Sequence, residues 1–438
     1  MKETEVIFSM ERIVVQGGNP LKGCLRINGA KNSAVALLAA SALTDAEVVL
    51  DNLPEISDVN VMLEILKAIG MNVTRLGQFE WRIAAGKQLS GQTPENLAVK
   101  LRASYYFLGS LLAKKGKVNV ALPGGCKIGS RPIDQHLKGF QALNVACLLE
   151  DGQVKLSTDH LQGGHIFFDM STVGATINVM LAASMAEGTT IMENAALEPE
   201  VIDIANFINA MGGKVKGAGT ETIRVTGVKY FGSCTYSCIP DRIEAGTFML
   251  AAAASGGDVT LTNVIPEHLE AVTAKLRESG MEVIPTLDSI RVKSTGRPKA
   301  VNIKTLPHPG FPTDLQAPAM AFFGLAEGSS VFNETIYESR FGHAEELNQM
   351  GANIKVDGQT AIVQGVKRYR GSFVTAANLR AGACLIIAGL AAEGTTTISG
   401  IEHIDRGYDR IVERLQTIGA DIKRQEFFSN MSAETIQN

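Results

Sequence analysis

One structural pattern occurs six times along the sequence, and this repetition limits the possible folds more than any other feature. In each copy, a helix rich in small residues is followed by a turn, a β-branched strand and then an amphipathic helix. The turns fall 66 to 72 residues apart, at Ala46, Gly116, Gly188, Gly256, Gly328 and Gly394. A fixed period of this kind predicts a fold assembled from six similar α+β units.

The two helices of each unit differ in their hydrophobic surfaces. The first helix carries small apolar residues on every side, as in VGATINVMLAASMA, and is predicted to be buried all round. The second helix, visible in five of the six copies, has apolar residues at i, i+3, i+4 and i+7, which marks one buried face. A glycine follows each of these five helices, where a left-handed C-cap is favoured; they are Gly70, Gly212, Gly280, Gly351 and Gly419.

The length of the chain, 438 residues, indicates more than one domain, because single hydrophobic cores stop growing at roughly 250–300 residues. We predict an α/β (α+β) protein with two pseudo-symmetric domains of three repeats each. Residues 31–239 form one domain. A discontinuous domain holds residues 240–438 together with residues 1–30, since the leading segment has no repeat partner of its own and is expected to complete this half.

One position, at the start of the first helix of each repeat, collects polar side chains. It lies 14 residues before each turn and is occupied by Asn32, Arg102, Gly174, Arg242, Asp314 and Arg380. Free N–H groups and the helix dipole favour anions at this end, whereas Lys and Arg oppose the dipole. A bound anion would relieve that misfit. Asp241 is better explained as an N-cap, and the same interpretation would be favoured for Asp314 taken alone.

The most unusual segment is the glycine-rich loop LPGGCKIGSRPIDQH at 122–136. Lys127 and Arg131 lie near Cys126 in this loop, and cations beside a thiol lower its pKa and raise its reactivity. A buried structural cysteine is the usual alternative, but a cationic, glycine-rich loop favours exposure. A cysteine phosphatase is a second alternative, although its signature places one more residue between Cys and Arg than the four found here.

The sequence lacks the features of several other classes of protein. The net charge of −4 argues against a nucleic-acid partner held by electrostatics. Neither the six cysteines nor the seven histidines have zinc-site spacing, and no nucleophile elbow or phosphate-binding P-loop occurs. Acidic residues interrupt the N-terminal apolar stretches, and no apolar run reaches the roughly 20 residues that span a bilayer. We therefore expect a soluble, cytoplasmic protein without a nucleic-acid or membrane partner, and its oligomeric state stays open.

Eight motifs together resemble the UDP-N-acetylglucosamine 1-carboxyvinyltransferase family of enolpyruvyl transferases. They are GAKNSA (29–34), LRAS (101–104), LPGGCKIGSRPID (122–134), TVGAT (172–176), LEPEVIDIANF (197–207), PDRIEAGTF (240–248), HPGFPTDLQA (308–317) and HIDRGYDRI (403–411). The resemblance implies a two-domain, inside-out α/β barrel of six repeats. It also implies transfer of the enolpyruvyl group of phosphoenolpyruvate to the 3-hydroxyl of UDP-N-acetylglucosamine, the first committed step of peptidoglycan precursor synthesis. No cofactor or metal is implied.

The resemblance assigns roles to individual residues. Cys126, on a mobile loop, matches the acid that protonates the methylene carbon of phosphoenolpyruvate, and Asp314 matches the carboxylate that takes the proton of the sugar 3-hydroxyl. Lys31 and Asn32 match residues that hold the phosphoenolpyruvate-derived part of the intermediate, and Lys31 and Arg406 complete the catalytic set. The basic residues of the same cleft are Arg102, Arg131, Arg380 and Arg406. The UDP-sugar is expected at Arg131, Pro132, Ile133, Asp134, Gln135, Thr172, Val173 and Ile336.

Three positions depart from the pattern of many relatives. Lysine is common in the family where this chain has Met170, leucine at Gln135, and lysine in some members at Ser57. These changes concern the grip on the nucleotide rather than the reacting centre. Three alternatives remain: a 3-phosphoshikimate 1-carboxyvinyltransferase, which would carry G-D-K-S in place of GAKN at 29–32, a catalytically idle paralogue that binds UDP-sugars, and an RNA-end-processing enzyme of similar repeats.

Overall fold

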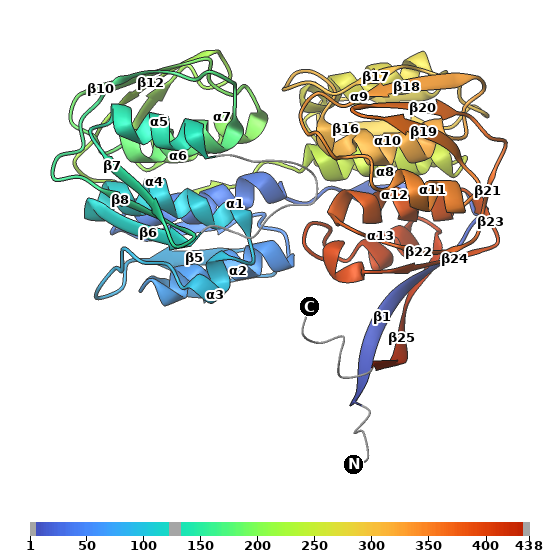
Figure 1. Ribbon diagram of the computed structural model, residues 1–438, viewed down its shortest axis with the longest axis horizontal. Coiled ribbons are helices and arrows are strands. Elements are labelled where there is room, and N and C mark those ends of the chain that lie inside the picture. Colours follow the sequence, from blue (N-terminus) through green and yellow to red (C-terminus); the bar gives the residue numbers. More distant parts are fainter. Residues whose placement is uncertain (1–5, 122–132, 432–438) are drawn as a thin grey trace. The chain divides into compact units, whose positions relative to one another are not determined.

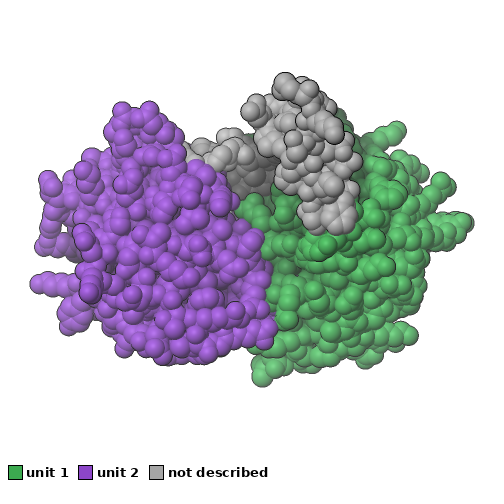
Figure 2. Space-filling view, turned by 90° about the horizontal axis from the view of Figure 1, so that it is seen from below, with its two compact units in different colours: residues 1–26, 245–305, 313–438 green, residues 27–244, 306–312 purple. Residues whose placement is uncertain are grey.

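The computed structural model describes residues 6–121 and 133–431 (Figure 1). The chain forms two compact units (Figure 2). Unit 1 consists of Met1–Arg26, Ala245–Thr305 and Thr313–Asn438, and unit 2 consists of Ile27–Glu244 and Leu306–Pro312. The division at 30/31 and 239/240 stays a prediction about folding domains; the repeat pattern did not anticipate that Leu306–Pro312 would join the unit of the first three repeats.

The first helix of every repeat forms where the sequence predicts it. These helices are α1 (Lys31–Ala40), α4 (Tyr106–Lys115, after the 3₁₀ turn Arg102–Tyr105), α6 (Val173–Ala183), α8 (Arg242–Ala254), α10 (Gln316–Phe323, after the 3₁₀ turn Thr313–Leu315) and α12 (Leu379–Leu390). Their small residues are buried on all sides: every residue from Ser33 to Ala40, and from Gly174 to Ala183, is buried. All six equivalent positions found in the sequence, five of them polar and one a glycine, lie at these helix starts, which confirms the prediction.

The second helices cover the sheets of their own repeats. They are α2 (Ser57–Ala68), α5 (Asp134–Ala142), α7 (Pro199–Ala210), α9 (Glu270–Glu278), α11 (Ala344–Gln349) and α13 (Ile411–Thr417); a further short helix, α3, spans Glu95–Ala98. The five glycines predicted as C-caps have positive φ between 92° and 103°. Because side chains other than glycine rarely adopt this conformation, these residues end the helices as expected.

Within the described residues, each repeat of unit 2 has its own small sheet. The first sheet has the order β13-β3-β5-β4, with β3 (Val48–Asp51), β4 (Asn72–Arg75), β5 (Trp81–Ala84) and β13 (Cys234–Ser237). The second has the order β6-β8-β7, with β6 (Lys117–Ala121), β7 (Ala146–Glu150) and β8 (Gln153–Ser157). The third has the order β11-β12-β10-β9, with β9 (His165–Phe167), β10 (Thr189–Glu193), β11 (Lys214–Lys216) and β12 (Thr222–Thr226).

Unit 1 is built in the same way and uses both ends of the chain. Its first two sheets have the orders β15-β16-β14-β2 and β17-β18-β20-β19. Their strands are β2 (Lys22–Arg26), β14 (Asp258–Thr262), β15 (Glu282–Pro285), β16 (Ser289–Lys293), β17 (Ile303–Lys304), β18 (Ser329–Asn333), β19 (Asn353–Asp357) and β20 (Thr360–Gln364). The third has the order β22-β24-β1-β25, with β1 (Val6–Gln16), β22 (Phe373–Thr375), β24 (Thr395–Ser399) and β25 (Asp421–Met431). Two short strands, β21 (Tyr369–Arg370) and β23 (Ala392–Glu393), pair with each other and precede β22 and β24 in the sequence.

The segment that precedes the first repeat therefore supplies strands to unit 1. β1 pairs antiparallel with β24 and along its full length with β25, and β1 and β25 form the long two-stranded ribbon in Figure 1. β2 pairs parallel with β14. Wherever a sheet contains a parallel pair, the ends of its two strands lie at the same edge of the sheet. The first helix of a repeat starts close to this edge, and the polar residues of the candidate site lie there.

Candidate functional site

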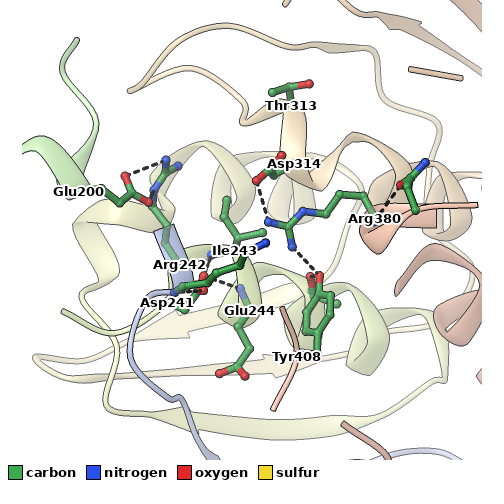
Figure 3. A network of polar contacts seen from close by, with 12 residues as sticks. Glu200, Asp241, Arg242, Ile243, Glu244, Thr313, Asp314, Arg380 and Tyr408 are labelled. Atoms are coloured by element: carbon green, nitrogen blue, oxygen red, sulfur yellow. Dashed lines mark hydrogen bonds and ion pairs between the residues drawn. The ribbon is translucent and has the colours of Figure 1, made fainter. Parts of the chain in front are cut away.

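Asp314 lies at a helix start in unit 1 between two guanidinium groups. One carboxylate oxygen, Oδ1, accepts a hydrogen bond from Arg340 Nη2 at 2.6 Å. The other, Oδ2, accepts one from Arg380 Nη2 at 2.7 Å, which is drawn in Figure 3. The side chains of Arg340 and Arg380 are 7% and 10% exposed, whereas that of Asp314 is 26% exposed. Both oxygens are thus used in ion pairs rather than in an N-cap, and the carboxylate stays accessible.

The two arginines keep this carboxylate ionised. Burial by itself would raise the pKa of Asp314, but the charges of Arg380 and Arg340, together with their hydrogen bonds, outweigh burial and hold the pKa well below the ordinary value of Asp. Asp314 is therefore negatively charged at any physiological pH.

Arg380 is itself held in one orientation. Its Nη1 donates to the hydroxyl of Tyr408 at 3.2 Å, and that hydroxyl also shares a hydrogen bond of 2.8 Å with Thr247. The side chain of Asn378 caps α12 by accepting from the backbone N–H groups of Arg380 and Ala381, both at 3.0 Å. Arg406, predicted as a catalytic residue, lies half-buried in the turn that precedes Tyr408. Unit 1 therefore brings two of the predicted residues, Asp314 and Arg380, into direct contact.

In unit 2, Lys31 is the first residue of α1 and its charge is paired. Nζ of Lys31 lies 2.8 Å from Oδ2 of Asp58, which is 3% exposed. The carboxylate of Asp241 accepts from Ile243 N at 2.8 Å and Glu244 N at 2.9 Å, and its other oxygen accepts from Lys31 N at 3.0 Å. The N-cap interpretation of Asp241 is thus confirmed, and this residue caps the starts of both α8 and α1. Asn32 follows on α1 and is exposed.

Carboxylates of the protein itself relieve the charge misfit at the helix starts. Arg242 makes a bidentate ion pair with Glu200, at 3.1 and 3.2 Å (Figure 3). Arg380 has Asp314 as its partner, and Lys31 has Asp58. The expectation that a bound anion would be needed to compensate these cations is therefore too simple. An anionic ligand at these positions would have to exchange with, or add to, a partner that is already present.

Aromatic rings explain why one helix start has glycine. The guanidinium of Arg102 lies 5.5 Å from the centre of the Tyr105 ring, and Tyr105 meets His136 edge to face at 4.8 Å. A Cβ atom at Gly174 would lie 2.6 Å from the Tyr105 hydroxyl and 2.9 Å from His136 Cε1, so a larger residue would force these two rings to shift. Burial, with the charge of Arg102 as a smaller cause, lowers the pKa of His136 to about 4, and its ring is therefore neutral at physiological pH.

The residues predicted for the sugar nucleotide lie at two further helix starts of unit 2 and after a strand of unit 1. Gln135 in α5 is buried: its Nε2 donates to Asp134 at 2.7 Å and to Asp169 at 3.1 Å, and its Oε1 accepts from Asp169 N at 2.9 Å. Met170, next to this network, is 58% exposed. The other residues predicted here and described by the structure are Ile133 before α5, Thr172 and Val173 at the start of α6, and Ile336 after β18. Cys126, Arg131 and Pro132 lie outside the described residues.

Sequence analysis missed the partners of the predicted residues. Arg340 and Asp58 carry no motif of their own, although Asp58 follows the noted position Ser57. Glu200 lies inside LEPEVIDIANF, a motif that indicated the family without giving this residue a role. Glu334 could have been found, because it breaks a regularity of the repeat that is described below. Within the described ranges, no group of three or more His, Cys, Asp or Glu side chains is placed to hold a metal ion. None of the helices described is both long and apolar enough to span a membrane.

The fold and these helix-start sites define an enolpyruvyl transferase. The model of the EPSP synthase (3-phosphoshikimate 1-carboxyvinyltransferase) family matches residues 15–415, and the chain belongs to this family. The solved enolpyruvyl transferase NikO from Streptomyces tendae superimposes with a TM-score of 0.85 at 26% identity, covering 96% of this chain and all of that one (100%).

Within the family, the chain is similar to enzymes named for one acceptor. It is 52% identical to UDP-N-acetylglucosamine 1-carboxyvinyltransferase 3 of Caldanaerobacter subterraneus subsp. tengcongensis, over 95% of this chain and 99% of that protein. It is also 52% identical to UDP-N-acetylglucosamine 1-carboxyvinyltransferase of Clostridium botulinum, over 95% of this chain and 100% of that protein. These findings confirm the resemblance and the fold class inferred from the motifs.

Proposed function

We propose that this chain transfers the enolpyruvyl group of phosphoenolpyruvate to the 3-hydroxyl of UDP-N-acetylglucosamine and releases phosphate. The observation that carries the proposal is the 52% identity, over 95% of the chain, to relatives that bear the name of this activity. A cytoplasmic location and a role in peptidoglycan precursor synthesis follow from the same choice of substrates.

Asp314 is proposed to take the proton of the sugar 3-hydroxyl. Its carboxylate is accessible and ionised, and Arg340 and Arg380 fix both of its oxygens in direction. When the carboxylate or phosphate of phosphoenolpyruvate engages Arg380, the positive charge is shared between two anions, and the proton affinity of Asp314 rises. A base whose strength increases only when the second substrate is bound avoids unproductive deprotonation.

Lys31 and Asn32 are proposed to hold the phosphate-bearing carbon skeleton, with Arg102 and Arg406 as further anion partners. The ion pair of Lys31 with the buried Asp58 holds the ammonium group at the start of α1 before substrate arrives. Because the side chain of Asp58 is nearly inaccessible to solvent, it pairs with Lys31 and does not bind cations from the solvent. Cys126, through its motif alone, is proposed as the proton donor to the methylene carbon.

The proposed reaction is an addition followed by an elimination. The donor protonates C3 of phosphoenolpyruvate, the sugar oxygen bonds to C2, and the hydroxyl proton passes to Asp314. The resulting tetrahedral intermediate bears both a phosphate and a carboxylate. The deprotonated donor then takes a proton back from C3, the electrons of that C–H bond form the C2–C3 double bond, and phosphate leaves with the electron pair of the C2–O bond. Cationic side chains held in place before the reaction stabilise the charge at low reorganisation cost.

Phosphate release from purified protein tests this proposal. Phosphoenolpyruvate should be supplied alone, with UDP-N-acetylglucosamine and, in a third assay, with shikimate 3-phosphate. Release only with UDP-N-acetylglucosamine, together with a product heavier by one enolpyruvyl group, is expected. Release from phosphoenolpyruvate alone would indicate a phosphatase, release with shikimate 3-phosphate the sister activity, and tight nucleotide binding without release an idle paralogue.

A further inference from the structure

Glu334, directly after β18 in unit 1, is a buried carboxylate that joins three segments. It is 1% exposed. Oε1 accepts hydrogen bonds from the Thr305 hydroxyl at 2.8 Å, from Ile336 N at 2.9 Å and from Tyr337 N at 3.3 Å. Oε2 accepts one from the Thr313 hydroxyl at 2.9 Å. A carboxylate offers about four lone-pair sites, so these four donors satisfy Glu334 without a cation bound directly to it.

The other repeats carry a different kind of residue at this position. The residue that directly follows the equivalent strand has a positive φ, between 54° and 72°, in four of them: Asn52, Asn194, Asn263 and Gly400. Among the described residues with positive φ, Glu334 does not occur. The fifth repeat, which contains Asp314, therefore departs from a conformation that these four repeats share.

The partner of this position departs as well. Asn52 and Asn194 each donate to the backbone carbonyl of the residue that directly follows the neighbouring parallel strand, Cys238 at 2.9 Å and Phe168 at 2.8 Å. In the fifth repeat the equivalent residue, which directly follows β17, is Thr305. Its hydroxyl donates to the carboxylate of Glu334 instead. The fifth repeat thus has an acid where these two repeats have an amide, and a hydroxyl where they have Phe168 or Cys238. Hydrogen bonds between side chains therefore replace the bond to a backbone carbonyl.

The hydrogen bonds that connect Glu334, Thr313 and Arg340 have a fixed direction. Thr313 Oγ1 lies 3.0 Å from Arg340 Nη1 and 2.9 Å from Glu334 Oε2. Arginine can only donate, so Thr313 must accept from Arg340 and give its single hydrogen to Glu334. The other nitrogen of the same guanidinium, Nη2, donates to Asp314. The negative charge of Glu334 therefore acts through one hydroxyl and one guanidinium on the carboxylate proposed to accept the proton.

We propose that Glu334 is a positioning residue that couples the proton acceptor to the segment that receives the sugar nucleotide. Through Thr313 and Arg340 it orients Asp314, and through its other oxygen it holds the backbone of Ile336 and Tyr337. The inference rests on the function proposed above. Contact of the sugar nucleotide with Ile336 thereby stiffens the same carboxylate that keeps Asp314 aimed at the 3-hydroxyl.

The variant Glu334→Gln separates the contacts of one carboxylate oxygen from those of the other. The amide oxygen can still accept from Thr305, Ile336 N and Tyr337 N, so the backbone segment keeps its support. The amide nitrogen then faces Thr313, which would meet two donors and lose the acceptor for its own hydrogen. The hydroxyl can no longer hold Arg340 in place. We expect kcat to fall about tenfold, within the cost of misplacing a reacting group, while KM for UDP-N-acetylglucosamine changes less than about threefold because the nucleotide segment is kept.

Thr313→Val removes the same link from the other side without touching the buried carboxylate. It should lower kcat by a similar factor, whereas Thr313→Ser, which keeps the hydroxyl, should restore it. The double variant Glu334→Gln/Thr313→Val should be no slower than Thr313→Val alone, because both changes break one pathway. Glu327→Gln, an exposed acid in the same repeat, serves as the matched control and should leave kcat unchanged.

These measurements decide between coupling and a purely structural role. Wild-type kcat in folded Glu334→Gln, multiplying losses in the double variant, or no rescue by Thr313→Ser would each overturn the proposal. If Glu334→Gln does not fold, wild-type kcat in Thr313→Val overturns it alone. A wild-type protein that releases no phosphate would instead refute the proposed function, so the two failures are distinguishable.

Discussion

Replacing Asp314 with Asn tests the centre of the proposed site with the smallest change in shape. Asp314 accepts from two guanidinium groups, and Asn has one oxygen to offer. One of two charge-assisted hydrogen bonds is therefore lost, at about 1.5–3 kcal/mol, and an amide N–H₂ group points at a cation. The side chain is 26% exposed, so water softens the loss and we expect destabilisation near the lower value. Against a typical stability of about 5–15 kcal/mol the fold should persist.

The effect on turnover should be much larger than the effect on folding. Removing a positioned proton acceptor costs a factor of about 10²–10⁴, equivalent to roughly 3–5.5 kcal/mol in the activation barrier. The assay is steady-state phosphate release with both substrates, accompanied by thermal unfolding and by calorimetric binding of UDP-N-acetylglucosamine, which should be retained.

Asp258→Asn is the matched control for this experiment. Asp258 also makes a bidentate ion pair in unit 1, with Arg291 at 2.8 and 2.7 Å, but on the surface of a sheet. Its turnover should equal that of the wild type. Near-native turnover in Asp314→Asn, or an equal loss in Asp258→Asn, would refute the assignment of Asp314 as proton acceptor.

Three further outcomes are expected. The epoxide antibiotic fosfomycin should inactivate the enzyme by alkylating Cys126, as seen by peptide mass mapping; equal labelling of the exposed Cys24 would count against this assignment. Burial lowers the pKa of His136 to about 4 and that of His343 to about 3, so below pH 6.5 the unfolded chain binds protons that the folded chain does not. As the pH is lowered, the free energy of unfolding should therefore fall by about 1.4 kcal/mol per pH unit for each histidine down to about pH 4. Denaturant titrations at several pH values should show that the unfolding free energy of His343→Gln depends less steeply on pH; an unchanged pH dependence would contradict the prediction. Met170→Lys should lower KM for UDP-N-acetylglucosamine about two- to fivefold at low salt, and the gain should disappear at high salt; a gain that persists in salt would show a different cause.

Much of the fold follows from local rules. The six helix starts, the buried small-residue helices and the left-handed glycines that end the second helices were all predictable, since each depends on the identity and spacing of residues within a few turns of chain. The N-cap role of Asp241 belongs to the same group. The family motifs then supplied the fold class and the activity, because they preserve residue types at particular positions of this local pattern.

The partners of the site residues could not be predicted in this way. Lys31 meets Asp58 on the second helix of its own repeat, whereas the pairs Arg242–Glu200 and Arg380–Asp314 each join two different repeats. No periodicity encodes such a pairing, because an ion pair depends on the distance and angle at which two elements pack. The expectation that an anion must bind at the cationic helix starts was too simple for this reason.

By itself, then, the sequence determined six α+β units, their helix starts and the polar residues placed there. Only the tertiary structure decided that both carboxylate oxygens of Asp314 pair with arginines rather than with the N–H groups of a helix start, and that Thr313 and Arg340 connect Glu334 to it. The physical reason is the difference in range, because propensity and capping act over about four residues. The hydrogen bonds that Glu334 accepts depend instead on Thr305, Thr313 and Arg340, which packing brings together from separate segments.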